Sequence, residues 1–203
     1  MSRALREMFS TYATRWPDEG DVAARFIAFV DTHADCLHRT CVPGHLTGSA
    51  LVTSPGLDQV LLTHHRKLGL WVQLGGHADG EANLAHVAMT EAKEESGLRS
   101  LHFLAHSCVG GTNPGDGSVK ASTDPMPFDL DIHEIPANAR DPAHLHYDVR
   151  YLIVAADPHG ETVVVSPESH DVRWFTLAEA RALTSEVSMH RQFDKLEALR
   201  RPT

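Results

Sequence analysis

Hydrophobic and polar residues recur with two different periods along the chain, and these periods predict both helices and strands. Val22, Phe26 and Val30 lie at helical spacing, so most of residues 1–40 is expected to be helical. Apolar runs and two-residue alternation predict strands at 45–54, 59–65, 70–74, 101–109, 128–135, 147–156, 161–165 and 172–175. Further helices are expected at 81–96, 177–183 and 187–199. This mixture predicts an α/β or α+β fold with a mixed sheet.

Residues 110–125 interrupt this pattern with a stretch rich in Gly, Pro, Ser and Asp. We predict a loop there, and its length favours a functional or mobile role because structureless loops beyond about 12–15 residues are uncommon in compact domains.

Length and charge narrow the class of protein. With 203 residues the expected number of domains is one, and the chain is long enough to bury a core without disulfides. The net charge of −9 argues against binding a nucleic-acid polymer, which requires a basic surface. It does not exclude a small phosphorylated substrate that is held through divalent cations, because those cations need acidic ligands.

The cysteine count and the apolar segments bear on location. The three cysteines are an odd, low number, which is typical of a reducing compartment. No segment approaches the roughly 18 apolar residues of a membrane span, and residues 1–16 lack the apolar core of a signal peptide. We therefore predict a cytoplasmic protein that does not bind membranes.

The helix expected at 81–96 carries two distinct faces. Ala85, Ala88, Met89 and Ala92 form a stripe of small apolar residues suited to close packing on a sheet, whereas three glutamates gather on a neighbouring side: Glu91, Glu94 and Glu95. Glutamate triplets on a solvated helix face are common, so the pattern alone favours a plain surface.

Two observations favour a metal site instead. The glutamates crowd the last turn before Gly97, where the helix dipole and their mutual repulsion both disfavour negative charge. The helix also follows a strand and the pair Gly75-Gly76, and glycines allow a backbone carbonyl to approach a cation. Mg²⁺ prefers such oxygen ligands together with substrate phosphates.

This strand, glycine loop and helix resembles the box of the Nudix hydrolase family. The box has a glycine, a glutamate six positions on, and then Arg-Glu-aliphatic-x-Glu-Glu-x-Gly-aliphatic; Gly76, Glu91, Glu94, Glu95 and the pair Gly97-Leu98 match it at the family spacing. The segment 172–180 is similar to the family's closing strand and the helix after it. The resemblance covers roughly residues 45–185.

The resemblance implies a fold and a domain organisation. The expected fold is a Nudix-type α/β/α sandwich with a mixed β-sheet and an extra N-terminal helical segment. Residues 1–203 are expected to form a single domain, with an N-terminal helical extension at 1–42, the Nudix core at 45–185 and a C-terminal helix at 187–203.

The resemblance also implies a chemistry and its residues. Mg²⁺ or Mn²⁺ would be held by Glu91, Glu94, Glu95 and the Gly75 carbonyl, with Glu94 also taking part in catalysis. The implied reaction is water attack on the phosphorus of a diphosphate in a nucleoside diphosphate derivative or a similar small diphosphate. Four further residues are candidates for the general base, of which Glu134 and His146 are preferred: Glu134, Glu168, His144 and His146.

The chain departs from the box at two positions. Thr90 replaces the arginine that usually orients the glutamates, and Ala82 replaces the earlier glutamate, with Glu81 one residue short of that position. These departures leave open whether metal binding is weakened.

Fifteen histidines are the second unusual feature, because histidine is both a metal ligand and a proton carrier. His77 directly follows the glycines, where it contacts either the loop or a metal or phosphate. In 144–154, strand alternation places His144, His146, Asp148 and Arg150 on one face; Arg150 is the candidate for binding a substrate phosphate and His146 for carrying a proton. The alternative for residues 144–154 is a strand whose polar face is simply exposed to solvent. Separately, the cysteines and histidines within 31–45 could form a zinc site.

Three functional hypotheses follow. The first is the metal-dependent diphosphate hydrolase, active on a small phosphorylated substrate, with a homodimer left open. The second is an enzyme similar to the type I isopentenyl diphosphate isomerases, which share the fold and bind metal with histidines and glutamates; the absence of cysteine from the loop at 75–81 counts against it. The third is a non-catalytic Nudix-fold binding or regulatory module.

Overall fold

The structure is a computed structural model that describes residues 2–104, 125–137 and 141–200. Apart from Pro125, the loop predicted at 110–125 lies outside the described residues.

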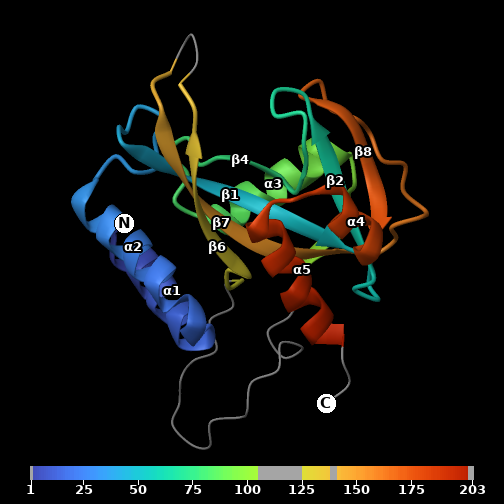
Figure 1. The fold of residues 1–203 in the computed structure, drawn as a ribbon, viewed down its shortest axis with the longest axis horizontal. Coiled ribbons are helices and arrows are strands. Elements are labelled where there is room, and N and C mark those ends of the chain that lie inside the picture. Colours follow the sequence, from blue (N-terminus) through green and yellow to red (C-terminus); the bar gives the residue numbers. More distant parts are fainter. Residues whose placement is uncertain (1, 105–124, 138–140, 201–203) are drawn as a thin grey trace, which may run out of the picture.

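The chain begins with a helical hairpin that packs on the rest of the molecule (Figure 1). Helix α1 spans Ser2–Arg15, a short 3-10 helix η1 spans Pro17–Glu19, and α2 spans Gly20–Thr32. From α2, the rings of Phe26 and Phe29 pack against Tyr147 of the sheet, with centroids 5.2 and 3.9 Å from its ring. The predicted N-terminal helical segment is therefore present, although it ends at Thr32 rather than near residue 40.

The described strands join in one sheet. Their bounds are β1 Gly44–Thr53, β2 Gln59–His65, β3 Trp71–Val72, β4 Leu74–His77, β5 Leu101–Phe103, β6 Asp129–Ile135, β7 His144–Ala155 and β8 Ser169–Thr176. The long strands β1 and β7 run parallel, from the pair Gly44 and Leu145 to the pair Thr53 and Val154. All other described pairings are antiparallel, so the predicted mixed sheet is confirmed.

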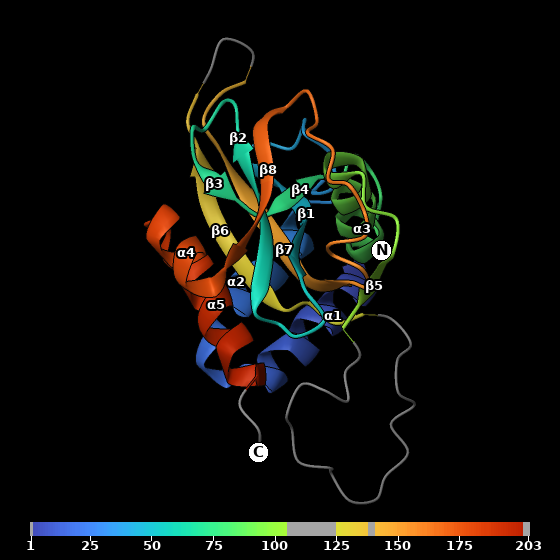
Figure 2. The same ribbon diagram turned by 90° about the vertical axis from the view of Figure 1, so that its right-hand side faces the viewer.

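Helices cover both faces of this sheet, as the turned view in Figure 2 shows. Helix α3 (Leu84–Ser96) lies on one side, whereas α4 (Leu177–Leu183) and α5 (Val187–Arg200) lie on the other. Each layer has its own core, one around α1, α2 and α3 and the other around α4 and α5. This arrangement confirms the predicted α/β/α sandwich.

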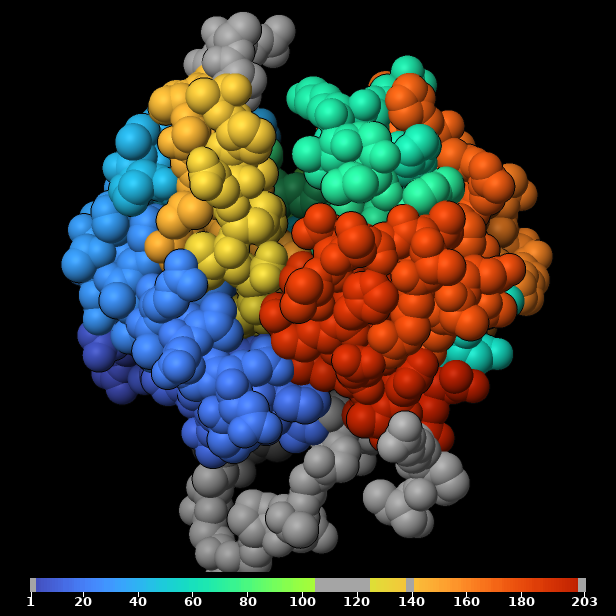
Figure 3. Space-filling view, viewed as in Figure 1, coloured from blue at the N-terminus to red at the C-terminus, as the bar shows by residue number. Residues whose placement is uncertain are grey.

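Strand alternation divides β1 and β7 into an apolar face and a mixed face. Leu46 and Val149 belong to the core beneath α3, and Leu51 and Leu152 belong to the core beneath α4 and α5. Towards the start of both strands the α5 face becomes polar, with His45, Thr47 and Ser49 on β1 and His144, His146, Asp148 and Arg150 on β7. Helix α5 does not cover all of this side, and Figure 3 shows a hollow between β6 (yellow) and the β2–β3 region (green).

Helix α3 lies unusually close to β1, because a glycine faces it. A Cβ on Gly48 would come within 2.7 Å of the Leu84 carbonyl oxygen. The helix begins after Asn83, whose side chain accepts a hydrogen bond from the His86 N–H, and ends at Gly97, whose φ of 73° is left-handed. The predicted glycine stop is thus confirmed, and the helix starts three residues later than the pattern indicated.

One predicted strand is wrong. Residues 161–165 are irregular in the structure. Their polar groups bond to the end of α3 and the following turn instead: the Val164 N–H donates to the Ser96 carbonyl at 2.7 Å, and Glu161 accepts from the Arg99 N–H at 2.7 Å. This bonding replaces the ladder that a strand would need.

Candidate active site

The glycine pair on β4 brings the backbone against the glutamates of α3. The Gly75 N–H donates a hydrogen bond to Glu95 Oε2 at 3.0 Å. Gly76 lies under Glu91, so closely that a Cβ at Gly76 would overlap the Glu91 carboxylate. Glycine is therefore required here by the close approach of helix and strand.

Burial and like charge act on these carboxylates in the same direction. Burial, with Glu91 and Glu168 as further causes, raises the pKa of Glu95 to about 7 despite the hydrogen bond from Gly75. Burial followed by repulsion from Glu94 and Glu168 also raises the pKa of Glu91. Glu94 is exposed.

In the part of the chain that the structure describes, the glutamates lack a neutralising partner. Within residues 2–104, 125–137 and 141–200, no Lys, Arg or His forms an ion pair within 4.0 Å with Glu91, Glu94 or Glu95. Buried carboxylates without a cation are costly, and oxygen ligands of this kind suit Mg²⁺ or Mn²⁺. The donor set therefore fits the predicted cation, although these three carboxylates do not converge within 4.8 Å as a described group.

The structure shows the surroundings of the two positions at which the chain departs from the box. Thr90 is half-buried and carries no charge that would orient the glutamates. Ala82 is exposed, and the neighbouring Glu81 accepts a hydrogen bond from the Asn83 N–H at 2.7 Å. Glu81 therefore closes the turn before α3, and its carboxylate is already engaged there.

Comparison with known families identifies this strand, loop and helix. A family model described as the NUDIX domain matches residues 45–196. The chain belongs to the NUDIX family. The match extends past the predicted core boundary at 185 and into α5, and it agrees with the predicted enzyme class, a Nudix-type diphosphate hydrolase.

Solved NUDIX structures share the fold at low sequence identity. A Caenorhabditis elegans Ap4A hydrolase in a binary complex is 16% identical with a TM-score of 0.53, and covers 75% of this chain and 95% of its own. A Clostridium perfringens NUDIX hydrolase is 22% identical with a TM-score of 0.52, covering 76% and 97%. The Escherichia coli dihydroneopterin triphosphate pyrophosphohydrolase is 15% identical with a TM-score of 0.51, covering 74% and 92%. No curated protein matches the chain.

Glu168 joins the NUDIX glutamates from a distant part of the sequence. It lies on the turn just before β8 and contributes to the raised pKa of both Glu91 and Glu95. Of the four base candidates, it is the one whose charge acts on the box carboxylates.

Glu134, by contrast, finds no support in the geometry. It is exposed on β6, and its neighbours His133 and Ile135 face the polar side of the sheet, so Glu134 faces the other way. Strands β7 and β1 separate β6 from β4, which places the two strands about 14 Å apart at the usual spacing of about 4.8 Å. This separation does not support Glu134 as the general base.

Arg150 is also unsuited to its predicted role. Its side chain is only 4% exposed, and the guanidinium donates to Asp148 at 2.7 Å, Asp131 at 3.1 Å and Asp129 at 3.3 Å. Because these carboxylates already take up its charge, the geometry does not support Arg150 as a phosphate ligand. The solvent-facing alternative for this strand is wrong as well, since Asp148 and Arg150 are both buried.

The predicted histidines lie on the same polar face. His77 is half-buried on β4, with its ring centroid 5.0 Å from the rings of both His45 and His146. Burial and neighbouring positive charge lower the pKa of His77, and burial with the adjacent histidines lowers that of His146 to about 2. An imidazole that resists protonation so strongly is a weak base, so His146 is a poor proton carrier.

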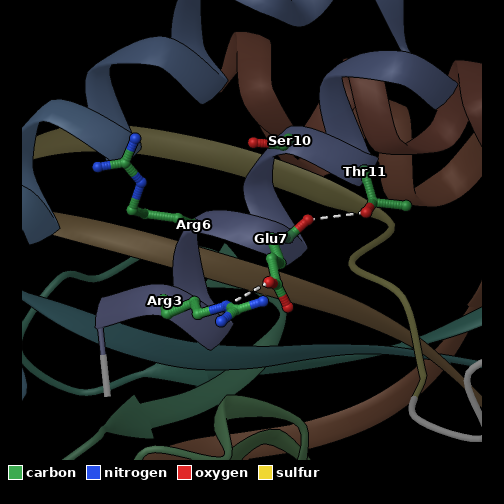
Figure 4. A pocket seen from close by; sticks show the side chains of 5 residues that line it. All are labelled: Arg3, Arg6, Glu7, Ser10 and Thr11. Atoms are coloured by element: carbon green, nitrogen blue, oxygen red, sulfur yellow. Dashed lines mark hydrogen bonds and ion pairs between the residues drawn. The ribbon is translucent and has the colours of Figure 1, made fainter.

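Two features outside this region carry no site. Cys36 and Cys41 are buried free thiols in the hydrophobic core, so of the cluster at 31–45 only His45 reaches the histidine group. Figure 4 shows an open hollow along α1, where Arg3 donates to the Glu7 carboxylate and Thr11 to the Glu7 carbonyl. Its lining comes from the exposed side of this one helix.

Among the described residues, no helix is long and apolar enough to cross a membrane.

Proposed function

We propose that the chain is a divalent-metal-dependent hydrolase that cleaves a diphosphate linkage in a small nucleotide-derived substrate. The observation that carries this proposal is the group of glutamates on α3, which are buried or crowded beside the glycine loop and have no ion-pair partner from Lys, Arg or His among the described residues. Glu91, Glu94 and Glu95, with the Gly75 carbonyl, would hold Mg²⁺ or Mn²⁺. When bound, the cation supplies charge neutralisation on the phosphates and activation of water.

The chain's own residues would divide the remaining work. Gly75 orients Glu95 through its N–H, and Gly76 leaves room for Glu91. Glu168 is the proposed base, because it is exposed and yet acts electrostatically on the box. Its position beside the box glutamates, rather than its basicity alone, favours Glu168 over Glu134 and His146.

The substrate class rests on analogy with relatives. The solved NUDIX proteins named above include hydrolases of Ap4A and of dihydroneopterin triphosphate, both of which carry phosphoanhydride bonds. A substrate of this class, a cytoplasmic location and a homodimer stay predictions for this chain.

The decisive experiment is a turnover screen with a matched variant. Nucleoside diphosphate derivatives, dinucleoside polyphosphates and small diphosphates are incubated with wild type and Glu95→Gln, with Mg²⁺, with Mn²⁺ and with a chelator. We expect metal-dependent turnover that Glu95→Gln reduces by roughly 100-fold or more, the scale of losing one charge-stabilising group. Reaction in ¹⁸O-labelled water should place the label in a phosphate product.

Glu186→Gln is the control, because Glu186 is exposed and lies outside the box. It should retain wild-type turnover. Equal turnover with a chelator, or in Glu95→Gln, would contradict the metal-dependent mechanism, whereas ligand binding without turnover on any substrate would favour the binding module.

A further inference from the structure

Histidines from four strands meet on the polar face of the sheet. The register places His133, His146 and His45 directly opposite one another in a row across β6, β7 and β1. The ring centroid of His45 lies 4.9 Å from the ring centroid of His144 and 4.9 Å from that of His146. The residues that converge were up to 101 positions apart in the sequence, so no local pattern brings them together.

Three of these rings offer ligand atoms close enough for one ion. One nitrogen each of His45, His144 and His146 lie within 4.8 Å of one another. In a tetrahedral zinc site with Zn–N distances near 2.1 Å, ligand nitrogens lie about 3.4 Å apart. Small ring rotations would therefore bring the three nitrogens onto one cation.

The buried member of the group has no hydrogen-bond partner among the residues that the structure describes. His45 is 2% exposed, and neither Nδ1 nor Nε2 has a hydrogen bond within the described part of the chain. The buried Nε2 of His146 is likewise without a partner there. Leaving a buried polar group unsatisfied destabilises the folded state, and a coordinated cation would take up one imidazole lone pair from each of these rings.

His144 is oriented in the way that metal-binding histidines usually are. Its Nδ1 lies 2.8 Å from the Pro142 carbonyl oxygen. A carbonyl only accepts, so Nδ1 carries the proton and Nε2 presents its lone pair. Donation of the second ring N–H to a backbone carbonyl or carboxylate fixes the tautomer of a ligating histidine.

The histidine group and the box glutamates lie on opposite sides of β4. Successive residues of a strand face opposite ways, and Gly76 faces Glu91 whereas His77 lies opposite Thr47 on the polar face. The two groups also differ in ligand type. Neutral imidazoles suit Zn²⁺, Co²⁺ and Ni²⁺, whereas carboxylates suit Mg²⁺ and Mn²⁺.

We propose that His45, His144 and His146 form a second metal site, specific for a divalent transition-metal ion such as Zn²⁺ and distinct from the glutamate site. Three imidazoles leave a fourth tetrahedral position open. His77 lies beside the group, with its ring 5.0 Å from those of His45 and His146. The partial exposure of His144 and His146 gives the ion an entry path.

Cobalt and zinc binding to the chelator-stripped full chain tests the site without any substrate. Co²⁺ titration is followed by visible absorption, and Zn²⁺ affinity by competition with a chromophoric chelator. We expect one tight Co²⁺ with a tetrahedral-type spectrum, displaced by Zn²⁺ and not by Mg²⁺. His144→Ala and His146→Ala should weaken Zn²⁺ binding by more than the 10–100-fold that loss of a merely supporting residue costs.

Two control variants keep the result interpretable. His102→Ala removes an exposed histidine on β5, and Glu95→Gln alters the box; both should keep the Co²⁺ spectrum and Zn²⁺ affinity. Circular dichroism checks folding, and His144→Ala carries the test if His146→Ala does not fold. Equal binding by wild type and the folded histidine variants, or loss of binding in Glu95→Gln alone, would overturn the proposal. Neither result depends on hydrolysis.

Discussion

The molecule holds two acidic clusters that are treated in opposite ways. The aspartates of β6 and β7 are neutralised from within: Arg150 contacts Asp129, Asp131 and Asp148, and two residues of α5, Arg191 and Lys195, donate to Asp129 at 2.8 Å. The glutamates of α3 have no such cation among the described residues, although Glu95 is buried, with 8% of its surface exposed.

The pKa directions record this difference. Burial alone would raise the pKa of Asp148, but Arg150 holds it below its ordinary value. At Glu95 no cation of the described residues opposes the effect of burial, and the pKa rises to about 7. The aspartates therefore tie α5 to the sheet through ion pairs, whereas the glutamates have no cation of the described chain beside them, which is what the proposed metal site requires.

Removing the cation from the neutralised cluster should have the largest effect on stability. Arg150→Met leaves three aspartates without their shared partner in a buried site. We expect the free energy of unfolding to fall by about 3–5 kcal/mol, as it does when one partner of a buried pair is lost. Urea denaturation at pH 7 measures it.

Arg173→Met is the matched control, since the side chain of Arg173 is 63% exposed, pairs with neighbouring Asp171 at the surface and lies 5.6 Å from the centroid of the Trp71 ring. It should cost less than about 1 kcal/mol. A similar small loss for Arg150→Met would mean that the aspartates do not depend on that guanidinium.

Removing charge from the unneutralised cluster should act in the opposite direction. The pKa of Glu95 is about 7 in the folded chain against an ordinary 4.5, so its ionisation costs stability. This cost is absent below about pH 4.5 and is complete above pH 7, where it reaches about 3 kcal/mol. In metal-free protein, Glu95→Gln should therefore be more stable than wild type at pH 8 and nearly equal to it at pH 4.5.

Thermal unfolding across this pH range measures the difference, and adding Mg²⁺ sharpens it. Binding to the folded state should raise the Tm of wild type and leave Glu95→Gln little changed. If the variant is less stable at pH 8 without metal, the idea of an uncompensated charge fails.

The smallest effect concerns an exposed pair that holds the glycine loop. Arg39 donates to Asp79 through Nε at 2.7 Å and Nη2 at 2.6 Å, and both side chains are more than half exposed. Arg39→Ala should lower the free energy of unfolding by less than about 1 kcal/mol. The charge of Arg39 partly offsets the effects that raise the pKa of Glu91. Loss of Arg39 should therefore raise that pKa slightly further, which NMR titration of Glu91 would detect. An unchanged titration would show that Arg39 does not reach the box.

The sequence predicted the glutamate region well because its information is local. Helical periodicity placed the small residues Ala85, Ala88 and Ala92 against the sheet, and all three are buried there. The spacing from Gly76 to Gly97 carried the family resemblance, and Gly97 does end the helix. Two-residue alternation likewise separated Tyr147 and Val149 from Asp148 and Arg150.

Two-residue alternation predicts which residues of a strand share a face, but it does not predict which other strand pairs with that strand. The sequence by itself determined the box helix, the glycine loop and the family. Only the tertiary structure decided that Arg150 is enclosed by aspartates from β6, that Glu168 acts on the box, and that His45 meets His144 and His146. The physical reason is that packing of the whole core sets the pairing and register of distant strands, and no short stretch of sequence contains that information.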